Sequence, residues 1–429
     1  MNRRHFRWWP ALLAVGGLVA LFLAAATLLG SGAPSSSGAS SEDLATVLEV
    51  VGVVKTHYLE PVSTLDLLAA YVRTGTINGM LRETVRDPYT RYMDADAFQQ
   101  LQVETSGHYA GIGVYIGIKD DRLTVVAPIP GTPAARAGLR AGDWIVEVDG
   151  RPTADMSQDE ASGLIRGPKG TTVRLTVERD GQRFTVAIER EEIDVPAVSA
   201  VQMLPGGIGY IRLLQFSEKA GREMEAALGS LERQGYRALI LDLRNNPGGL
   251  LTAAIDVASL FLPGGPVVHV VGRSGERNSI NASPGRAHPQ VPMAVLVNKG
   301  SASASEIVAG ALRDRGVATL VGTTTFGKGL VQTIIPLRRG DAVVVTTQKY
   351  QTAGGHFIGN EGIHPDVEVQ VPPEQAEQLP LVEDRVDPGD VQLQKAVQIL
   401  MERLSQAADA GPGAREAAPR AAAPLRAAA

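Results

Sequence analysis

The sequence predicts a multidomain α+β protein with an α/β C-terminal body and a single N-terminal transmembrane helix. Three observations predict this class: one long apolar run near the N-terminus, a stretch of short β-branched segments broken by Gly and Pro, and a C-terminal half in which strand and helix patterns alternate. At 429 residues the chain is long enough for two or three domains with separate cores.

An N-terminal membrane anchor is predicted for residues 1–30. Three arginines precede the uncharged run WWPALLAVGGLVALFLAAATLL, and about 20 apolar residues suffice to span a bilayer as a helix. Basic flanks stay in the cytoplasm, so the body is expected outside it, in the periplasm or at the surface of a bacterial cell. A cleaved signal peptide is the alternative, because small residues near the end of the run permit cleavage.

A linker and a helical region are expected next. Residues 31–41 are rich in Gly and Ser, as in flexible linkers. Residues 42–105 show helical spacing of apolar positions and are expected to form an assembly or docking element. At the other end, residues 372–406 are expected to hold one amphipathic helix, and the Ala/Pro-rich residues 407–429 to be disordered. The terminal helices offer a route to a homo-oligomer.

Residues 106–192 read as five short strands with two helix candidates. This order, with PGTPAARAGLRAGDWIVEVDG in its middle, resembles a PDZ domain. In that fold the loop that here comprises Gly111, Ile112, Gly113 and Val114 directs backbone N–H groups at the terminal carboxylate of a peptide, which adds as a strand to the sheet. A generic β-barrel loop is the alternative. The resemblance implies protein or peptide C-termini as partners.

Residues 193–371 are expected to form a largely parallel α/β sheet. The strand patterns IGYIRL, ALILDLR, VPMAVLVN, ATLVG and AVVVTTQKYQ occur here, and helical patterns separate the first four. Sites in such sheets gather at the carboxyl ends of the strands. Three of these ends run into NNPGGLL, NKGSASASE and TTTFGKGLVQ, so a Gly-Gly turn, a serine and a lysine are expected to meet at one edge.

The serine-rich segment allows two interpretations. Ser303 and Glu306 have the spacing of a helix capping box, which is a structural role. A cap leaves Ser301 and Ser305 unexplained, however. Alternatively Ser303 is a nucleophile beside the free N–H groups of a helix N-terminus, with the Ala304 N–H as an oxyanion donor. The motif alone leaves both interpretations open.

A nucleophilic serine needs a base, and Lys328 is the best candidate. Only eight of the 41 basic residues are lysines, and lysine, unlike arginine, becomes a base when burial lowers its pKa. Phe326 and the residues after Lys328 are expected to supply apolar walls, and Gln332 to orient the amine. A surface lysine in a turn is the alternative. Gly248 and Gly249 also allow two interpretations. They form an exposed turn, or they lie beside the serine and one of their backbone N–H groups is a second oxyanion donor.

Composition excludes other chemistries. The chain has no cysteine, which removes disulfides, thiolate metal sites and a Cys nucleophile. Its net charge of −5 offers no basic surface for nucleic acid. No metal or cofactor is implied, since no H-E-x-x-H motif or carboxylate cluster is present.

The combination of SASASEIVAGALRD, TFGKGLVQ, DLRNNPGGLL and a PDZ-like module resembles the C-terminal processing peptidases, or tail-specific proteases. This resemblance covers about residues 42–370. It implies Ser303 as the nucleophile, Lys328 as the general base assisted by Gln332, and the amides of Gly249 and Ala304 as oxyanion donors. It also implies a core related to the Clp-protease and crotonase fold.

Two further positions match the family's motifs. Arg166 matches an arginine thought to report substrate binding from the PDZ domain to the catalytic core, although an ordinary solvated arginine is the alternative. Asp314 lies eleven residues after Ser303, roughly 16 Å along a helix, so we expect it to be structural. The sequence therefore predicts an exported serine endopeptidase that recognises protein C-termini. A catalytically silent PDZ scaffold is the competing hypothesis, and the intact serine, lysine and glutamine argue against it.

Overall fold

The computed structural model describes residues 44–371, except 120, 121, 130, 155, 157 and 360, and residues 389–409. The chain forms two compact units, residues 1–48 and residues 49–429. The predicted membrane helix and the linker lie outside the described residues, as does most of the C-terminal tail. Within the described ranges, no helix has the length and apolar character needed to cross a membrane.

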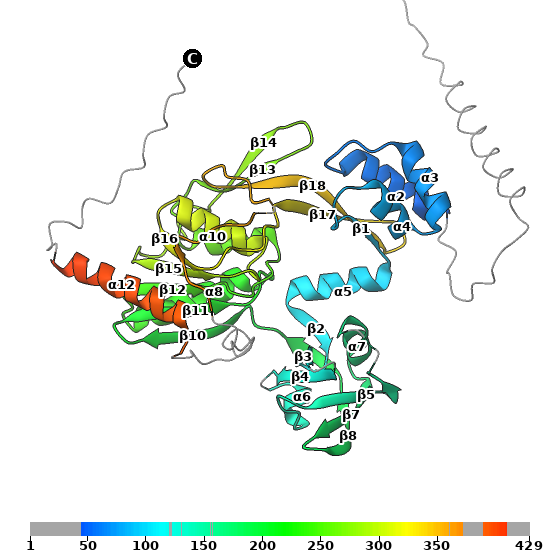
Figure 1. Ribbon diagram of the computed structural model, residues 1–429, viewed down its shortest axis with the longest axis horizontal. Helices are drawn as coiled ribbons and strands as arrows, with labels where there is room; N and C mark the ends of the chain where they lie inside the picture. Colours follow the sequence, from blue (N-terminus) through cyan, green and yellow to red (C-terminus); the bar gives the residue numbers. More distant parts are fainter. Residues whose placement is uncertain are drawn as a thin grey trace, which may run out of the picture. The chain divides into compact units, whose positions relative to one another are not determined.

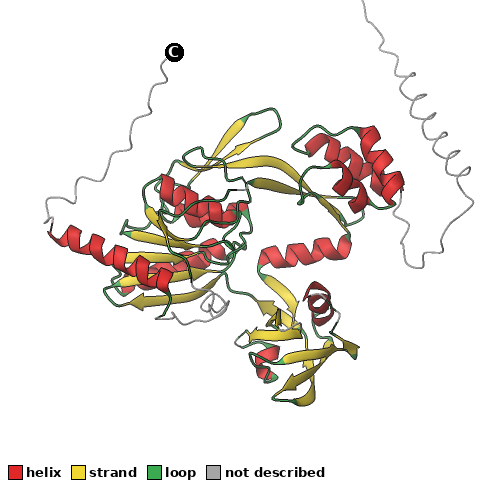
Figure 2. Ribbon diagram, viewed as in Figure 1, coloured by secondary structure: helices red, strands yellow, loops and turns green. Residues whose placement is uncertain are grey.

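The N-terminal region is helical, with one short strand (Figure 1, Figure 2). Its elements are α2 (Leu44–His57), α3 (Thr64–Thr74), α4 (Ile77–Thr84), β1 (Arg91–Met93) and α5 (Ala95–Ser106). The apolar pattern that spans α3 and α4 is divided at Gly75, which ends α3 in the left-handed conformation. Thr76 then caps α4 by accepting the N–H of Gly79 at 3.0 Å.

The PDZ-like module contains the five strands expected from the sequence. They are β3 (Val114–Lys119), β4 (Arg122–Pro128), β5 (Trp144–Val148), β7 (Thr172–Arg179) and β8 (Gln182–Glu189), which form one antiparallel sheet together with β6 (Arg151–Pro152). Helices α6 (Pro133–Arg136) and α7 (Gln158–Ile165) accompany it. Where the chain enters and leaves the module, β2 (His108–Gly111) pairs antiparallel with β9 (Glu191–Asp194). The module has its own apolar core, which includes Ile112 and Ile165.

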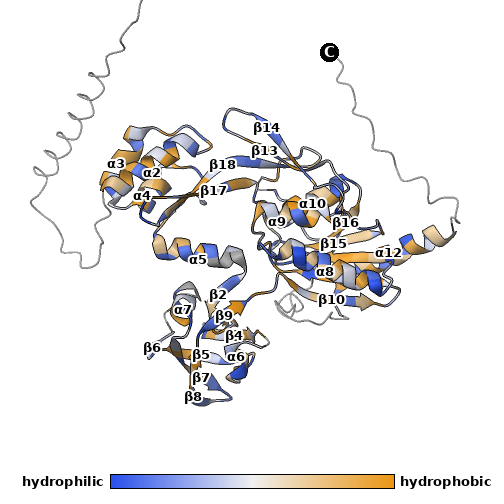
Figure 3. Cartoon of the chain, turned by 180° about the vertical axis from the view of Figure 1, so that it is seen from behind, coloured by the Kyte–Doolittle hydropathy of each residue, from blue (hydrophilic) through white to orange (hydrophobic). Residues whose placement is uncertain are grey.

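The C-terminal body contains a six-stranded sheet. Its order is β10 (Val198–Leu204), β11 (Ile208–Leu213), β12 (Ala238–Asp242), β15 (Met293–Val297), β16 (Ala318–Gly322) and β19 (Val367–Glu368), and only the β10–β11 pair is antiparallel. Hydrophobic residues fill its central strands (Figure 3), as expected for parallel strands that are buried on both faces.

Helices cover both faces of this sheet, and the side chains of each strand divide between them. Leu239 and Leu241 of β12 pack with α8 (Ala220–Arg233), α9 (Leu251–Ser259) and α10 (Ala304–Asp314) in one core. Ala238 and Ile240, which alternate with them, pack with α12 (Val391–Asp409) in another. Helix α12 extends through Asp409, so the first residues of the tail expected to be disordered are helical.

A second, antiparallel sheet corrects one expectation. The AVVVTTQKYQ segment is β18 (Ala342–Thr352), and it does not join the parallel sheet. It pairs instead with β1, β13 (Pro266–Val271) and β17 (Leu330–Pro336). A further strand, β14 (Arg277–Asn281), pairs with β13. The cause is the connection from β17, which is too short for the crossover that parallel pairing requires. Through β1, the N-terminal region contributes a strand to this sheet.

Candidate active site

The three segments singled out in the sequence follow neighbouring parallel strands. Residues 243–250 follow β12, residues 298–303 follow β15 and residues 323–329 follow β16. Strands β12, β15 and β16 are adjacent and parallel. Their carboxyl ends therefore lie at the same edge of the sheet, which is where ligand sites of such folds are found.

Ser303 is the N-cap of α10 and has an unusual backbone conformation. Its φ is +54° and its ψ is −111°, a combination that costs a non-glycine residue about 1–3 kcal/mol and is concentrated at functional sites. Its backbone N–H donates to Glu306 Oε2 at 2.8 Å, so the glutamate half of the predicted capping box is formed. The surrounding contacts must therefore hold Ser303 in a conformation that it would not adopt alone.

The two flanking serines are structural. Ser301 and Ser305 are fully buried. Ser301 Oγ donates to the carbonyl of Leu243 at 2.8 Å, and Ser305 Oγ donates to the carbonyl of Asn246 at 2.8 Å. Both serines thus tie the segment before α10 to the segment after β12. Their roles explain why the serine motif repeats, which a single cap did not.

The carboxylate of Glu306 joins the serine and lysine segments. This side chain is completely buried. Its Oε2 accepts the N–H groups of Ser303 at 2.8 Å and Lys328 at 2.9 Å, while Oε1 accepts the N–H of Gly327 at 2.7 Å and the hydroxyl of Thr325 at 2.5 Å. Because one oxygen accepts both N–H groups, the backbone nitrogens of Ser303 and Lys328 lie within about 6 Å of each other.

Lys328 lies in an environment that favours its neutral form. Burial lowers the pKa of its amine, the nearby Arg91 lowers it further, and Glu306 acts in the opposite direction. The Nζ atom lies 4.6 Å from the centre of the Tyr89 ring. Within the described residues, no hydrogen bond joins Lys328 Nζ to Ser303 Oγ. The structure therefore brings the two segments together without a formed Ser303–Lys328 hydrogen bond.

A cavity of about 420 Å³ surrounds Lys328. Its walls include Tyr58, Tyr89 and Leu330. Phe326, which the sequence suggested as a wall, is 56% exposed and is absent from the lining. That expectation was wrong because the N–H of Phe326 donates to the carbonyl of Ser301 at 3.0 Å, which fixes the backbone there while the ring remains in solvent. The aromatic wall comes instead from Tyr58 and Tyr89 of the N-terminal region and from Phe357.

The Gly-Gly turn packs directly against the serine. A Cβ atom on Gly248 would lie 2.9 Å from both Ser303 Cβ and Ala304 N, and Gly248 has φ +100°, so only glycine fits there. Phe216 donates its N–H to the carbonyl of Gly248 at 2.9 Å and accepts the N–H of Leu250 at 2.8 Å. In this pairing the N–H of Gly249 points away from Phe216.

Gln332 lies on β17, and within the described residues no hydrogen bond joins its amide to Lys328. Its Nε2 donates to the carbonyl of Leu330 at 3.3 Å and to Thr346 Oγ1 at 3.4 Å. Thr346 Oγ1 in turn donates to Asp87 at 2.9 Å. Gln332 is thus connected, through Thr346, to the loop that carries Tyr89.

The loop of the PDZ-like module contains one buried side chain. Ile112 is only 1% exposed and belongs to the module's core, so its side chain packs inside the module. The backbone N–H groups of Val114 and Gly113 lie close enough to the Tyr109 phenol to lower its pKa. Burial raises the pKa of this phenol, and Arg166 and the two N–H groups oppose the increase.

Arg166 and Asp314 have defined surroundings. The guanidinium of Arg166, just after α7, lies 5.0 Å from the centre of the Tyr109 ring, so it sits beside the loop and not in bulk solvent. Asp314, at the end of α10, accepts the N–H of Gly354 at 2.8 Å. This contact ties α10 to the residues after β18 and agrees with a structural role.

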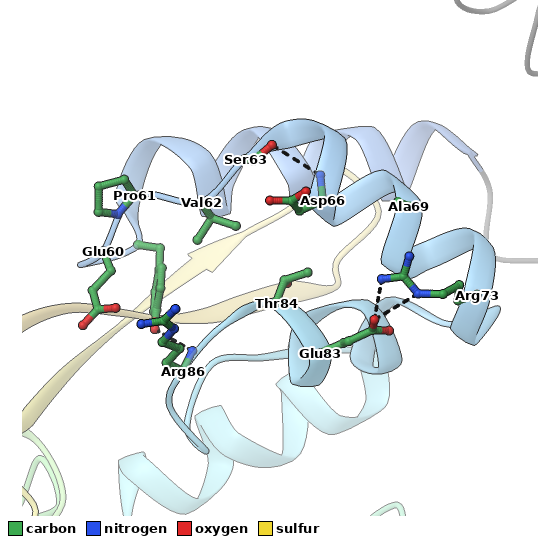
Figure 4. Close-up of a pocket in the computed structure, with 11 residues that line it drawn as sticks. Glu60, Pro61, Val62, Ser63, Asp66, Ala69, Arg73, Glu83, Thr84 and Arg86 are labelled. Atoms are coloured by element: carbon green, nitrogen blue, oxygen red, sulfur yellow. Dashed lines mark hydrogen bonds and ion pairs between the residues drawn. The ribbon is translucent and has the colours of Figure 1, made fainter.

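A larger cavity of about 610 Å³ lies among the N-terminal helices (Figure 4). Glu60, Asp66, Arg73, Glu83 and Arg86 line it, and Figure 4 shows Arg73 turned toward Glu83, with which it forms an ion pair. None of the residues at the three strand ends lines this cavity. Its size alone therefore does not make it the active site.

Comparisons with known proteins agree with this arrangement. The model of Peptidase family S41 matches residues 207–369, that of the PDZ domain residues 124–179, and that of the activating protease CtpB N-terminal domain residues 26–97. A carboxyl-terminal-processing protease of a Synechocystis species is 43% identical over 324 residues, which are 74% of this chain and 74% of the relative. The chain belongs to the carboxyl-terminal-processing proteases of peptidase family S41. It is a serine-type peptidase with a PDZ domain.

Two further family members are similar over most of this peptidase. A carboxy-terminal-processing protease of Bartonella bacilliformis is 42% identical over 305 residues, which are 69% of each chain. The solved structure of the photosystem II D1 C-terminal processing protease is 32% identical, with a TM-score of 0.53, and the match covers 78% of this chain and 94% of that one.

Sequence reasoning missed three residues of this peptidase's site. Glu306 was recognised only as part of a cap, because its contacts with residues 325–328 join segments that are distant in sequence. Tyr89 and Asp87 were missed because they belong to the N-terminal region. The Asp-Pro of RDPYT is a turn signal, and it could have located the turn without indicating what packs on it.

We expect Glu306→Gln to damage both stability and turnover. In the glutamine side chain, an NH₂ group replaces one of the two carboxylate oxygens, each of which accepts two hydrogen bonds. At least two buried donors therefore lose their acceptor, and each loss costs about 1–3 kcal/mol of stability. Urea unfolding should show a loss of about 2–6 kcal/mol, and turnover of a peptide substrate should fall at least tenfold. Glu402→Gln, on the exposed face of α12, is the matched control. Wild-type stability in Glu306→Gln would show that this carboxylate does not hold the two segments together.

Proposed function

We propose that the chain is an exported endopeptidase that recognises the C-termini of its substrates and cleaves them with a Ser303–Lys328 dyad. The observation that carries this proposal is the shared carboxylate of Glu306, which accepts N–H groups from both residues. The strained backbone of Ser303 and the lowered pKa of Lys328 support it.

In the proposed mechanism, neutral Lys328 removes the proton of Ser303 Oγ as this oxygen attacks the scissile carbonyl carbon. The negative charge moves to the carbonyl oxygen, and the N–H groups of Gly249 and Ala304 stabilise it. The Lys328 ammonium then gives its proton to the leaving amine. Water hydrolyses the acyl-enzyme by the same steps, with Lys328 again accepting a proton. Gln332 is proposed to orient the amine once the dyad has closed.

The role of Lys328 can be tested with Lys328→Arg, which keeps the positive charge. Arginine cannot accept the proton of Ser303, so turnover should fall by roughly 10²–10⁴-fold. Wild-type activity should rise with pH through one ionisation below the lysine reference of about 10.4, because only the neutral amine acts as base. Stopped assays of peptide cleavage across pH provide both measurements. A Lys328→Arg enzyme with about a third of wild-type turnover would exclude the dyad.

Tail binding is proposed at the amides of the PDZ loop, where a substrate carboxylate would replace the Tyr109 phenol. A free C-terminal acid should bind about tenfold or more tightly than the same peptide as an amide, since charged hydrogen bonds are the stronger ones. Tyr109→Phe removes the internal competitor and should tighten binding of the acid severalfold, while leaving the amide little changed. Fluorescence anisotropy with the Ser303→Ala protein measures these affinities. Equal affinity for acid and amide would refute the assignment.

The N-terminal segment is proposed to anchor the peptidase with its body outside the cytoplasm. Its basic flank and its apolar run support this topology. Protease added to spheroplasts of an expressing bacterium should degrade the body, and removal of residues 1–41 should give an enzyme that is recovered in the soluble fraction and remains active. A body that resists protease until the membrane is broken would contradict export.

A further inference from the structure

The catalytic lysine proposed above rests against a tyrosine that the proposed mechanism does not use. Lys328 Nζ lies 4.6 Å from the centre of the Tyr89 ring, within the range of a cation–π contact. Tyr89 belongs to the connection between α4 and β1, far from the peptidase strands in sequence. Both residues line the cavity of about 420 Å³.

The backbone that carries this ring is held by Asp87. Its Oδ1 accepts the N–H groups of Tyr89 and Thr90, each at 2.8 Å, and the hydroxyl of Thr346 at 2.9 Å. Thr346 is on β18, so this carboxylate fastens the Tyr89 loop to the sheet that also contains β17. On the other side, Tyr58 Oη accepts the N–H of Arg86 at 3.0 Å. The loop is therefore attached at both ends.

The ring acts through its face and not through a phenolate. Burial raises the pKa of the Tyr89 phenol, and the negative charges of Asp87 and Glu306 raise it further. The phenol is thus harder to ionise than that of a free tyrosine. A neutral aromatic face attracts an ammonium group and has no comparable attraction for a neutral amine.

Other charged groups around the lysine do not offer a comparable partner. Arg91 disfavours a positive charge on Lys328 and Glu306 favours one, but the Glu306 carboxylate already accepts four hydrogen bonds. The remaining charged residues that line the cavity are Glu60, Arg86, Asp87 and Lys349. In the described part of the chain, no ion pair involves Lys328.

We propose that Tyr89 is a positioning residue whose ring stabilises the positive charge that Lys328 acquires when it takes the proton of Ser303. The proposal rests on the role of Lys328 given above. The proton passes from Ser303 Oγ to Lys328 Nζ, and the ring favours the product of that transfer. The N-terminal region thereby takes part in the chemistry, in addition to any role in docking.

The test compares Tyr89→Leu with Tyr89→Phe. Leucine keeps the apolar cover but removes the aromatic face, so the ammonium loses stabilisation and the pKa seen in the pH dependence of kcat/KM should fall by about one unit. Turnover at high pH should fall by up to about tenfold, since a less basic amine is a weaker general base. Phenylalanine keeps the face, and its profile should follow that of the wild type.

A second measurement does not depend on activity. With ¹³C-labelled lysine, the ε-methylene signal of Lys328, identified by its loss in Lys328→Arg, should be shifted upfield by the Tyr89 ring in the wild type and in Tyr89→Phe. The shift should be absent in Tyr89→Leu.

Three outcomes would overturn the inference: a Tyr89→Leu profile that coincides with the wild type, a Tyr89→Phe profile that shifts as far as that of Tyr89→Leu, or an unshifted Lys328 signal in the wild type. An active Lys328→Arg enzyme would instead overturn the proposed dyad. An inactive Lys328→Arg combined with an unchanged Tyr89→Leu would refute only the role of the ring.

Discussion

The buried carboxylate of Glu306 is the interaction on which the rest of the site depends. A single oxygen of this side chain accepts the backbone N–H groups of Ser303 and Lys328, and the other oxygen accepts the Gly327 N–H and the Thr325 hydroxyl. A buried carboxylate is costly unless all of its oxygens are satisfied, so the fold holds these donors in place. The same contacts keep Ser303 in a strained conformation at the start of α10. Stability and the geometry of the site are thus coupled through one side chain.

Much of this architecture follows from local sequence patterns. The strands that end at Asp242, Val297 and Gly322 could be predicted because each is a short apolar run that leads into a segment containing glycine. Their meeting at one edge follows from parallel pairing alone. The segments around Ser303 and Lys328 were therefore expected at one edge, without any knowledge of the contact that joins them.

The remaining features depend on contacts between distant segments, which local patterns do not encode. The capping box identified Glu306 as a partner of Ser303, but nothing near Glu306 in sequence points to the N–H groups after β16. Phe326 was expected to cover the lysine, and an aromatic residue of the N-terminal region does so instead. Ile112 was expected at a binding surface, but the module's core needs its side chain. The antiparallel pairing of β18 with β17 follows from their short connection and not from strand propensity, and β18 also pairs with the distant strand β1.

The site therefore draws on more of the chain than the peptidase strands. Strand β1 and the Asp87 turn attach the N-terminal region to the antiparallel sheet, and Gln332 connects to the same turn through Thr346. In the PDZ-like module, the loop amides of Gly113 and Val114 lie near the Tyr109 phenol, and Arg166 lies against its ring. Within the described residues, no hydrogen bond joins Lys328 Nζ to Ser303 Oγ, although Glu306 accepts the backbone N–H groups of both residues.

The most direct test is the pKa of the Lys328 amine itself, measured by NMR titration of ¹³C-labelled lysine in the Ser303→Ala protein. The chain has only eight lysines, and Lys328→Arg identifies the relevant signal by its loss. The account predicts that Lys328 titrates clearly below the exposed lysines, because burial and Arg91 disfavour its charged form. Titration of Lys328 together with the exposed lysines, near the reference value of about 10.4, would contradict it.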